Sequence, residues 1–107
     1  MAFFELRHYR MRPGQREAWV KLMEEEIIPF QTKQGMVICG SFVGEEDKDL
    51  YVWLRRFESE EEREKLYEDV YQSDVWKNDI GPRVGDLIDR EQIKVTRIEA
   101  TPKSVLR

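Results

Sequence analysis

Cysteine and histidine each occur only once in this sequence of 107 residues. The single cysteine, Cys39, cannot form an internal disulfide, which suits a reducing compartment and a packing role for a small apolar side chain. One cysteine and one histidine, His8, cannot supply the common ligand sets of zinc. Glycine-rich phosphate loops and the G-x-S-x-G nucleophile motif are missing as well. We therefore expect no bound metal and no cofactor.

Excess positive charge and long apolar runs are also missing. The formal net charge is −4, and the basic residues are dispersed among acids, so the chain lacks the positive field that attracts phosphate backbones. No uncharged run approaches the roughly 20 residues that span a bilayer, and residues 1–10 lack the apolar core of a signal peptide. We expect a cytoplasmic protein with no nucleic-acid partner and no membrane span.

The chain does contain enough apolar material for one core. Hydrophobic residues make up 40% of it, including three tryptophans, four tyrosines and five phenylalanines. A chain of this length is too short for two stable cores, because small domains bury too little apolar surface. We predict a single domain over residues 1–107, with a core from about residue 3 to residue 99 and a tail at 100–107.

Four segments have the composition of β-strands. Residues 3–11 are rich in aromatic and other large side chains, and the Pro13–Gly14 turn closes them. Runs at 36–45 and 50–57 flank a short polar loop, which predicts an antiparallel hairpin. Residues 92–99 alternate between apolar and polar side chains, as a closing strand does.

The segments between these strands have the residue patterns of helices. Apolar residues recur at three- and four-residue steps over 19–30, where we expect Pro29 to kink the helix or end it one residue earlier. Ser59 with Glu62 three positions later forms a capping-box pattern that predicts the start of a second helix. A further short helix is expected after it, and the Gly81–Pro82 pair should separate this helix from the residues that follow.

The resulting order predicts an α+β fold of the ferredoxin-like βαββαβ type, a four-stranded antiparallel sheet with helices on one face. Both faces of the first strand carry large side chains, which alternate between Phe4, Leu6 and His8 on one face and Phe3, Glu5, Arg7 and Tyr9 on the other. Helices on one face leave the other uncovered. We expect a second, identical subunit to cover it, which would make a dimeric α+β barrel.

Three short blocks carry a family resemblance. The first strand reads Glu-Leu-Arg-x-Tyr over 5–9 before Pro13–Gly14, residues 54–58 read Leu-Arg-Arg-Phe-Glu before the second helix, and Asp74 precedes Trp76 by two positions. In this order, over about residues 3–88, the blocks resemble the NIPSNAP family, within the dimeric α+β barrel proteins. The resemblance implies the dimeric barrel fold, but no single settled reaction.

Glu5, Arg7 and Tyr9 are the first candidate site, because a forked guanidinium matches a carboxylate and a phenol adds a donor. As structure, such a network would set strand register or subunit pairing. As function, it would bind an acidic or carbonyl-bearing ligand. The structural interpretation is favoured, since buried ion pairs commonly serve specificity without chemistry.

His8 is the second candidate, because every scheme with an imidazole base must use it. Its alternation with Arg7 places it on the opposite strand face. A lone histidine in a strand is more often packed than catalytic, so the catalytic interpretation is the minor one.

Aromatic side chains form the third candidate. Trp53 and Arg55 share a strand face with Tyr51, and together with Phe42 and Trp76 they predict an aromatic ligand cavity holding one cation. The same spacing equally predicts ordinary core, which is the favoured interpretation.

Two functional hypotheses follow. The first is a homodimer that binds a small, partly aromatic or acidic molecule, or acts as an interaction module. The alternative is a cofactor-independent monooxygenase that acts on an electron-rich aromatic substrate, with His8, Arg7 or Tyr9 as catalytic residues. The alternative rests on fold analogy alone.

Overall fold

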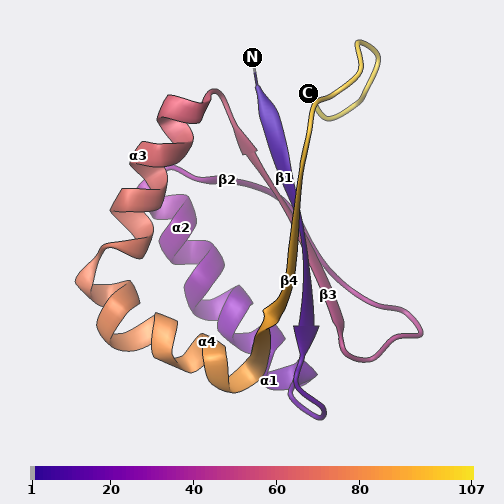
Figure 1. Cartoon of the computed structure of the whole chain (residues 1–107), viewed down its shortest axis with the longest axis vertical. Helices are drawn as coiled ribbons and strands as arrows, with labels where there is room; N and C mark the ends of the chain where they lie inside the picture. Colours follow the sequence, from indigo (N-terminus) through magenta and orange to yellow (C-terminus); the bar gives the residue numbers. More distant parts are fainter. Residues whose placement is uncertain (1) are drawn as a thin grey trace.

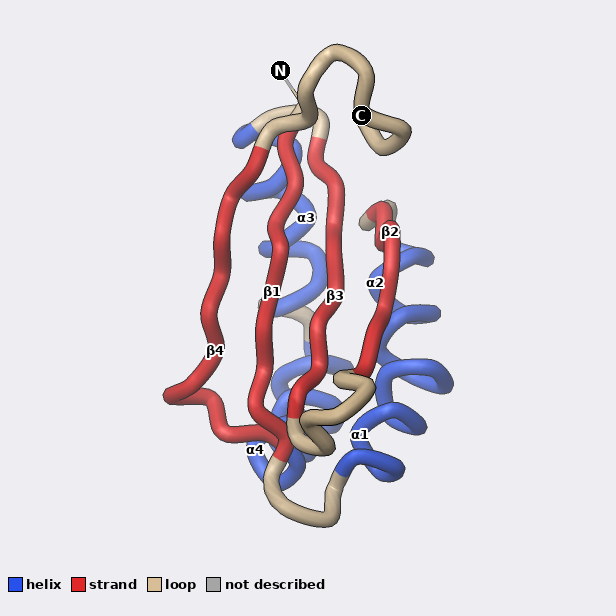
Figure 2. Tube along the Cα trace, turned by 90° about the vertical axis from the view of Figure 1, so that its right-hand side faces the viewer, coloured by secondary structure: helices blue, strands red, loops and turns tan. Residues whose placement is uncertain are grey.

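The structure is a computed structural model and describes residues 2–107. Four antiparallel strands form its sheet (Figure 1). Their order is β2-β3-β1-β4, as Figure 2 shows with the sheet facing the viewer. The strands are β1 (Phe3–Met11), β2 (Val37–Val43), β3 (Leu50–Phe57) and β4 (Ile88–Ile98). The central strand β1 pairs with β3 on one side and with β4 on the other. The predicted ferredoxin-like α+β fold is confirmed.

Helical segments cover one face of this sheet and leave the other without helices (Figure 2). Between β1 and β2 run α1 (Arg16–Leu22), the π-helical η1 (Met23–Ile27) and α2 (Ile28–Gln34). Between β3 and β4 run α3 (Glu60–Tyr71), the π-helical η2 (Trp76–Ile80) and α4 (Gly81–Leu87).

The two prolines expected to interrupt helices do not end them. The first helical segment passes Pro29 and continues to Gln34, so the early end, one of the two expected alternatives, was wrong. An interruption of the regular α-helical bonding does occur just before Ile28, where η1 ends and α2 begins. The reason is a π turn, in which the backbone N–H of Ile28 bonds to the carbonyl of Met23. Pro29 then lies in the first turn of α2, where its missing N–H removes no intrahelical bond.

The same arrangement recurs at Gly81–Pro82. The backbone N–H of Gly81 bonds to the carbonyl of Trp76 and closes a π turn, and proline again falls in the first turn of the helix that follows. The expected boundary at this pair exists as a change from π-helical to α-helical bonding at Gly81, and the chain stays helical across it for the same physical reason.

Strand ends differ from prediction mainly in β4, which begins at Ile88 instead of residue 92. Its pairing with β1 is irregular, because His8 lies opposite Lys94 while Arg10 lies opposite Asp89. The extra residues of β4 form a bulge at this point, and alternation of apolar and polar residues does not extend through a bulge.

The predicted start of α3 is confirmed. The Ser59 hydroxyl accepts a hydrogen bond from the backbone N–H of Glu62 at 3.1 Å. The Glu62 carboxylate reaches back to the backbone N–H of Glu58 at 3.0 Å, one residue before the cap. One free N–H of the first α-helical turn, that of Glu62, is therefore satisfied by the cap, and the N–H of Glu58 just before the helix is satisfied by Glu62.

Alternation along β3 separates the two faces of the sheet. Tyr51, Trp53, Arg55 and Phe57 are buried under the helices, whereas the residues between them are half-buried on the face without helices. We call this second face, which carries Leu6, His8, Phe42, Val52, Leu54 and Ile98, the open face. The tail reaches the end of this sheet, where the Arg107 carbonyl accepts a bond from Arg56 Nε at 2.6 Å.

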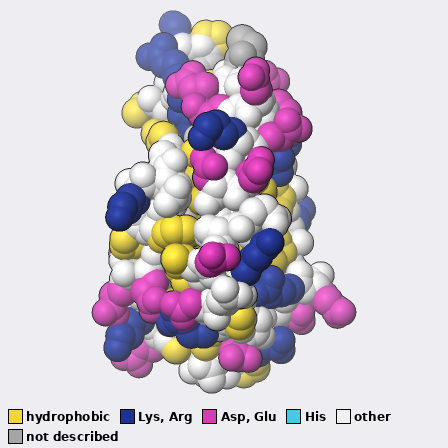
Figure 3. Space-filling view, turned by 90° about the vertical axis from the view of Figure 1, so that its left-hand side faces the viewer, with side chains coloured by type: hydrophobic (Ala, Val, Ile, Leu, Met, Phe, Trp, Pro, Cys, Tyr) yellow, Lys and Arg dark blue, Asp and Glu magenta, His cyan; other side chains and the backbone are white. Residues whose placement is uncertain are grey.

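The outer surface of the helix layer mixes acidic and basic side chains without a large patch of one sign (Figure 3). Charges on α3 accordingly form local pairs such as Lys65 with Asp69 at 2.7 Å. Across residues 2–107, no helix is long and apolar enough to cross a membrane.

Candidate functional site

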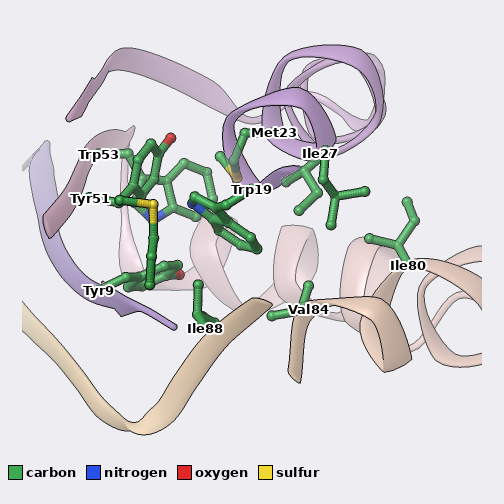
Figure 4. Close-up of a cluster of buried hydrophobic side chains, with 11 residues drawn as sticks. Tyr9, Trp19, Met23, Ile27, Tyr51, Trp53, Ile80, Val84 and Ile88 are labelled. Carbon is green, nitrogen blue, oxygen red and sulfur yellow. The ribbon is translucent and has the colours of Figure 1, made fainter. Parts of the chain in front are cut away.

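A cavity of about 220 Å³ lies between the helix layer and the sheet. Trp19, Met23 and Ile27 of the first helical segment face Val84 and Ile88 across this region (Figure 4). Its aromatic walls come from both layers and comprise Tyr9, Trp19, Trp53, Tyr67, Tyr71 and Trp76. The site is therefore a small chamber with mostly aromatic and aliphatic walls.

The two central strands deliver the polar groups at the edge of this cavity. Glu5 lies directly opposite Arg55 in the register of β1 and β3, and Arg7 lies opposite Trp53. Because side chains alternate along a strand, all four project to the face covered by helices. The predicted pairing of a carboxylate with guanidinium groups on one strand face thus exists, and Arg55 is its main partner.

Glu5 accepts bonds from four different residues, Arg7 among them, although its side chain is fully buried. Its carboxylate lies 2.8 Å from Arg55 Nη2 and 2.7 Å from Arg63 Nε. The Tyr67 hydroxyl lies 2.7 and 2.8 Å from its two oxygens. Burial by itself would raise the pKa of Glu5, but the Arg55 charge and these hydrogen bonds outweigh burial and lower the pKa to about 2. Glu5 is therefore ionised at neutral pH.

Arg55 is buried as completely as Glu5 and is held by further neutral partners. Its Nη1 donates to the Gln31 side-chain oxygen at 2.9 Å and to the Tyr71 hydroxyl at 2.8 Å. Its guanidinium also lies 4.6 Å from the centre of the Trp53 ring, within cation–π range. Both Nη atoms of Arg55 therefore donate to groups of the protein.

Arg7 is held mainly by neutral groups. Its Nε donates to the Tyr9 hydroxyl at 3.0 Å, and its Nη1 donates to the Tyr67 hydroxyl at 3.2 Å. Its nearest carboxylate oxygen belongs to Glu5 and lies 3.4 Å away. Arg7 lines the cavity, so this cation faces the empty space.

Neither phenol beside Arg7 is a base at neutral pH. Burial raises the pKa of Tyr9 above its ordinary value. Burial also raises the pKa of Tyr67, to about 12. Both hydroxyls therefore stay protonated and act as hydrogen-bonding groups.

His8 lies on the open face, on the other side of the sheet from Arg7 and Tyr9. It stands between Val52 of β3 and Lys94 of β4, and its buried Nδ1 atom has no partner among residues 2–107. The three residues considered as catalytic thus do not form one site.

The aromatic candidates also divide between two places. Trp53 and Trp76 line the cavity. Tyr51 and Phe42 line a separate groove of about 790 Å³ between α1 and the edge of the sheet. Arg16, Glu17, Lys21 and Glu24 also line this groove, so it is a surface feature of mixed charge.

Sequence reasoning missed several members of the site. Gln31, Arg63 and Tyr71 all bond to the Glu5–Arg55 pair, yet none was predicted as a site residue. The available signal was the position of Tyr67 and Tyr71 one helical turn apart on α3, which places two hydroxyls on the buried side of one helix. In residues 2–107, no group of three or more His, Cys, Asp or Glu side chains could hold a metal ion.

Comparison with known structures finds close likeness over the whole chain. A NIPSNAP family protein from Agrobacterium tumefaciens is 26% identical, with a TM-score of 0.87 and 100% of both chains covered. Another from the same organism, of unknown function, is 24% identical, with a TM-score of 0.88 and coverage of 99% of this chain and 94% of its own. A NIPSNAP-like domain protein from Burkholderia xenovorans is 19% identical, with a TM-score of 0.85 and coverage of 96% and 88%. The last two show a shared fold alone.

No curated protein matches the chain. The NIPSNAP family model, however, matches residues 4–102. This range contains all the strands and helices of the structure apart from Phe3, the first residue of β1. This match confirms the resemblance seen in the short blocks of the sequence. The chain therefore belongs to the NIPSNAP family.

Proposed function

We propose that this protein binds a small, partly aromatic molecule in the cavity between its sheet and its helix layer. The observation that carries the proposal is a pair of buried donors in the cavity walls. Trp19 and Trp53 both line the cavity, and the indole N–H of each is buried with no partner among residues 2–107. A buried donor without an acceptor costs about 1–3 kcal/mol, so a ligand with an oxygen acceptor would offset that cost.

The cavity favours binding over the monooxygenase alternative. An oxygenase without a cofactor needs a base beside the substrate, because removal of a proton raises the electron density of the substrate. The only imidazole, His8, lies beyond the sheet, and Tyr9 and Tyr67 hold their protons at neutral pH. Glu5 is ionised but accepts bonds from Arg55, Arg63 and Tyr67, which lowers its basicity.

Tryptophan indole signals supply a direct test of ligand binding. In a two-dimensional nitrogen–proton NMR spectrum, we expect single-ring aromatic compounds at millimolar concentration to shift the indole signals of Trp19 and Trp53 saturably. Single Trp→Phe variants assign these signals. Absence of any saturable shift with benzoate, benzamide, phenol and benzyl alcohol would contradict the proposal.

A cavity-filling variant locates the binding. Val84 lines the cavity, and Val84→Phe should occupy its space and weaken binding at least tenfold. The matched control is Val75→Phe, because Val75 is 49% exposed and outside the cavity. Circular dichroism checks that both variants fold, since overpacking costs about 1–3 kcal/mol. Equal binding by wild type and a folded Val84→Phe variant would rule out this cavity.

We further propose that the protein pairs with a second copy through the open face. Leu6 and Leu54 lie directly opposite each other at its centre. Phe42 is 57% exposed and Ile98 is 39% exposed, so the apolar surface extends to strands on both edges. Contiguous apolar patches of this kind commonly mark an interface between subunits.

A further inference from the structure

We propose that the ligand of this cavity is a single-ring aromatic carboxylate whose carboxylate binds Arg7. This inference rests on the binding function proposed above and adds the chemical class of the ligand. It is carried by the balance of charge around the cavity, by the free donors of Arg7, and by the size and composition of the walls.

Charge around Glu5 is unbalanced. The guanidinium groups of Arg7, Arg55 and Arg63 lie 3.4, 2.8 and 2.7 Å from its carboxylate, so three positive groups share one negative group. Arg63 also reaches Glu60 at 3.3 Å on the surface. Among residues 2–107, Arg7 pairs with no carboxylate other than that of Glu5, and an arginine does not lose its proton inside a protein. Arg7 therefore has the longest of the three contacts to this shared carboxylate, and its charge is the least well balanced.

The position of Arg7 makes this imbalance costly. Its side chain is only 14% exposed, and its other close partners, Tyr9 and Tyr67, are neutral phenols. Charges that are mostly buried in proteins are normally closely paired, because a charge is unfavourable in a low-dielectric interior without a partner. An anion brought into the cavity would supply a second counterion, close to Arg7.

Arg7 also has donors available for that anion. Its Nε and Nη1 bond to protein groups, whereas its Nη2 atom makes no hydrogen bond to any group of residues 2–107. A second arginine, Arg90 of the β4 bulge, lines the same cavity. No aspartate or glutamate is among the lining residues of the described chain, although the protein as a whole carries a net charge of −4. The walls therefore favour an anion over a cation or a neutral polar molecule.

The rest of the cavity determines what kind of anion fits. Its volume of about 220 Å³ lies below the range of roughly 300–1,000 Å³ typical of drug-sized ligands, so it suits one ring. Trp19, Trp53 and Ile88 supply flat or aliphatic surface that a phosphate or sulfate would leave unused. A planar carboxylate can accept two bonds from a guanidinium while its ring packs against these walls.

Titration of wild-type protein with benzoate and with benzamide, its neutral isostere, tests the charge requirement by calorimetry. We expect benzoate to bind at least tenfold more tightly than benzamide. Equal or tighter binding of benzamide would overturn the inference and leave the proposed binding function standing. If neither compound binds, the binding function itself fails. Competition by inorganic phosphate as strong as that by benzoate would contradict the aromatic part of the inference.

Arginine variants test the role of Arg7. Arg7→Gln should abolish the preference for benzoate while benzamide binding changes less than threefold. Arg10→Gln is the matched control, because Arg10 lies on the same strand and pairs with exposed Asp47 at 2.6 Å. It should keep the full preference. Retention of the preference by Arg7→Gln would contradict the assignment of Arg7, and the wild-type comparison decides the ligand class even if that variant fails to fold.

Discussion

Glu5 is the single residue whose replacement we expect to lower the stability of the fold most. Its carboxylate is surrounded by guanidinium and phenol groups and is removed from solvent. Buried ion pairs add little stability compared with apolar packing, but removal of one partner leaves the other charge uncompensated. Replacement of Glu5 would leave Arg55 as a fully buried cation with only neutral partners.

We predict that Glu5→Gln lowers the free energy of unfolding at pH 7 by about 3–5 kcal/mol, measured by urea denaturation. The pKa of Glu5 is about 2 in the folded protein, below its ordinary value of 4.5. A lowered pKa means that the stabilisation is fully present above about pH 4.5 and is lost as the pH falls toward 2. The difference between wild type and Glu5→Gln should therefore shrink over that interval.

The control for this prediction is Glu58→Gln, because Glu58 pairs with Arg56 at 2.6 Å but is 65% exposed. It should change stability far less than Glu5→Gln at every pH. If the two variants lose equal stability at pH 7, the buried network does not have the role described here.

At the scale of single elements, helix starts depend on a few local bonds. The Ser59 hydroxyl caps α3, and Glu60, Glu61 and Glu62 place negative charge in its first turn. Acidic groups at this end interact favourably with the helix dipole. The α3 start was predictable for this reason, since both the cap and the acids are encoded in adjacent residues.

We expect Ser59→Ala to lower the free energy of unfolding by about 1 kcal/mol, because the N–H of Glu62 loses its acceptor. Ser59→Asp keeps an acceptor at the cap and should retain most of that stability. Thermal unfolding followed by circular dichroism measures both variants. An Ala variant as stable as the Asp variant would show that the cap contributes nothing.

Helix continuation was less predictable than helix starts. A proline normally ends a helix because its ring clashes with the preceding turn and its nitrogen cannot donate. Here Pro29 and Pro82 each follow a π turn and begin a new α-helical turn. Local sequence does not reveal such turns, because packing of Ile27 and Ile80 in the core favours continuation in both cases.

At the scale of the whole molecule, the main feature is a sheet covered on one side only (Figure 2). Its open face carries apolar side chains from all four strands. A second copy is the occupant proposed above, and it would bury this surface through a symmetric contact.

Sedimentation velocity at micromolar concentration tests this proposal. We expect the wild type to sediment as a dimer and Phe42→Asp to shift toward monomer, because a charge would be placed in an apolar contact. Val75→Asp is the control, since Val75 is 49% exposed but lies on the helical side of the molecule. A monomeric wild type, or equal dissociation of both variants, would refute the pairing.

The sequence by itself determined the order of strands and helices, the limits of β3, the cap of α3 and the face on which each residue of β1 lies. These features follow from neighbouring residues, through side-chain alternation and local hydrogen bonds. Only the tertiary structure decided that Gln31, Arg63 and Tyr71 complete the network around Glu5 and Arg55, and that His8 lies apart from the cavity. Those contacts join elements far apart in the chain, and their geometry depends on how the helices pack on the sheet.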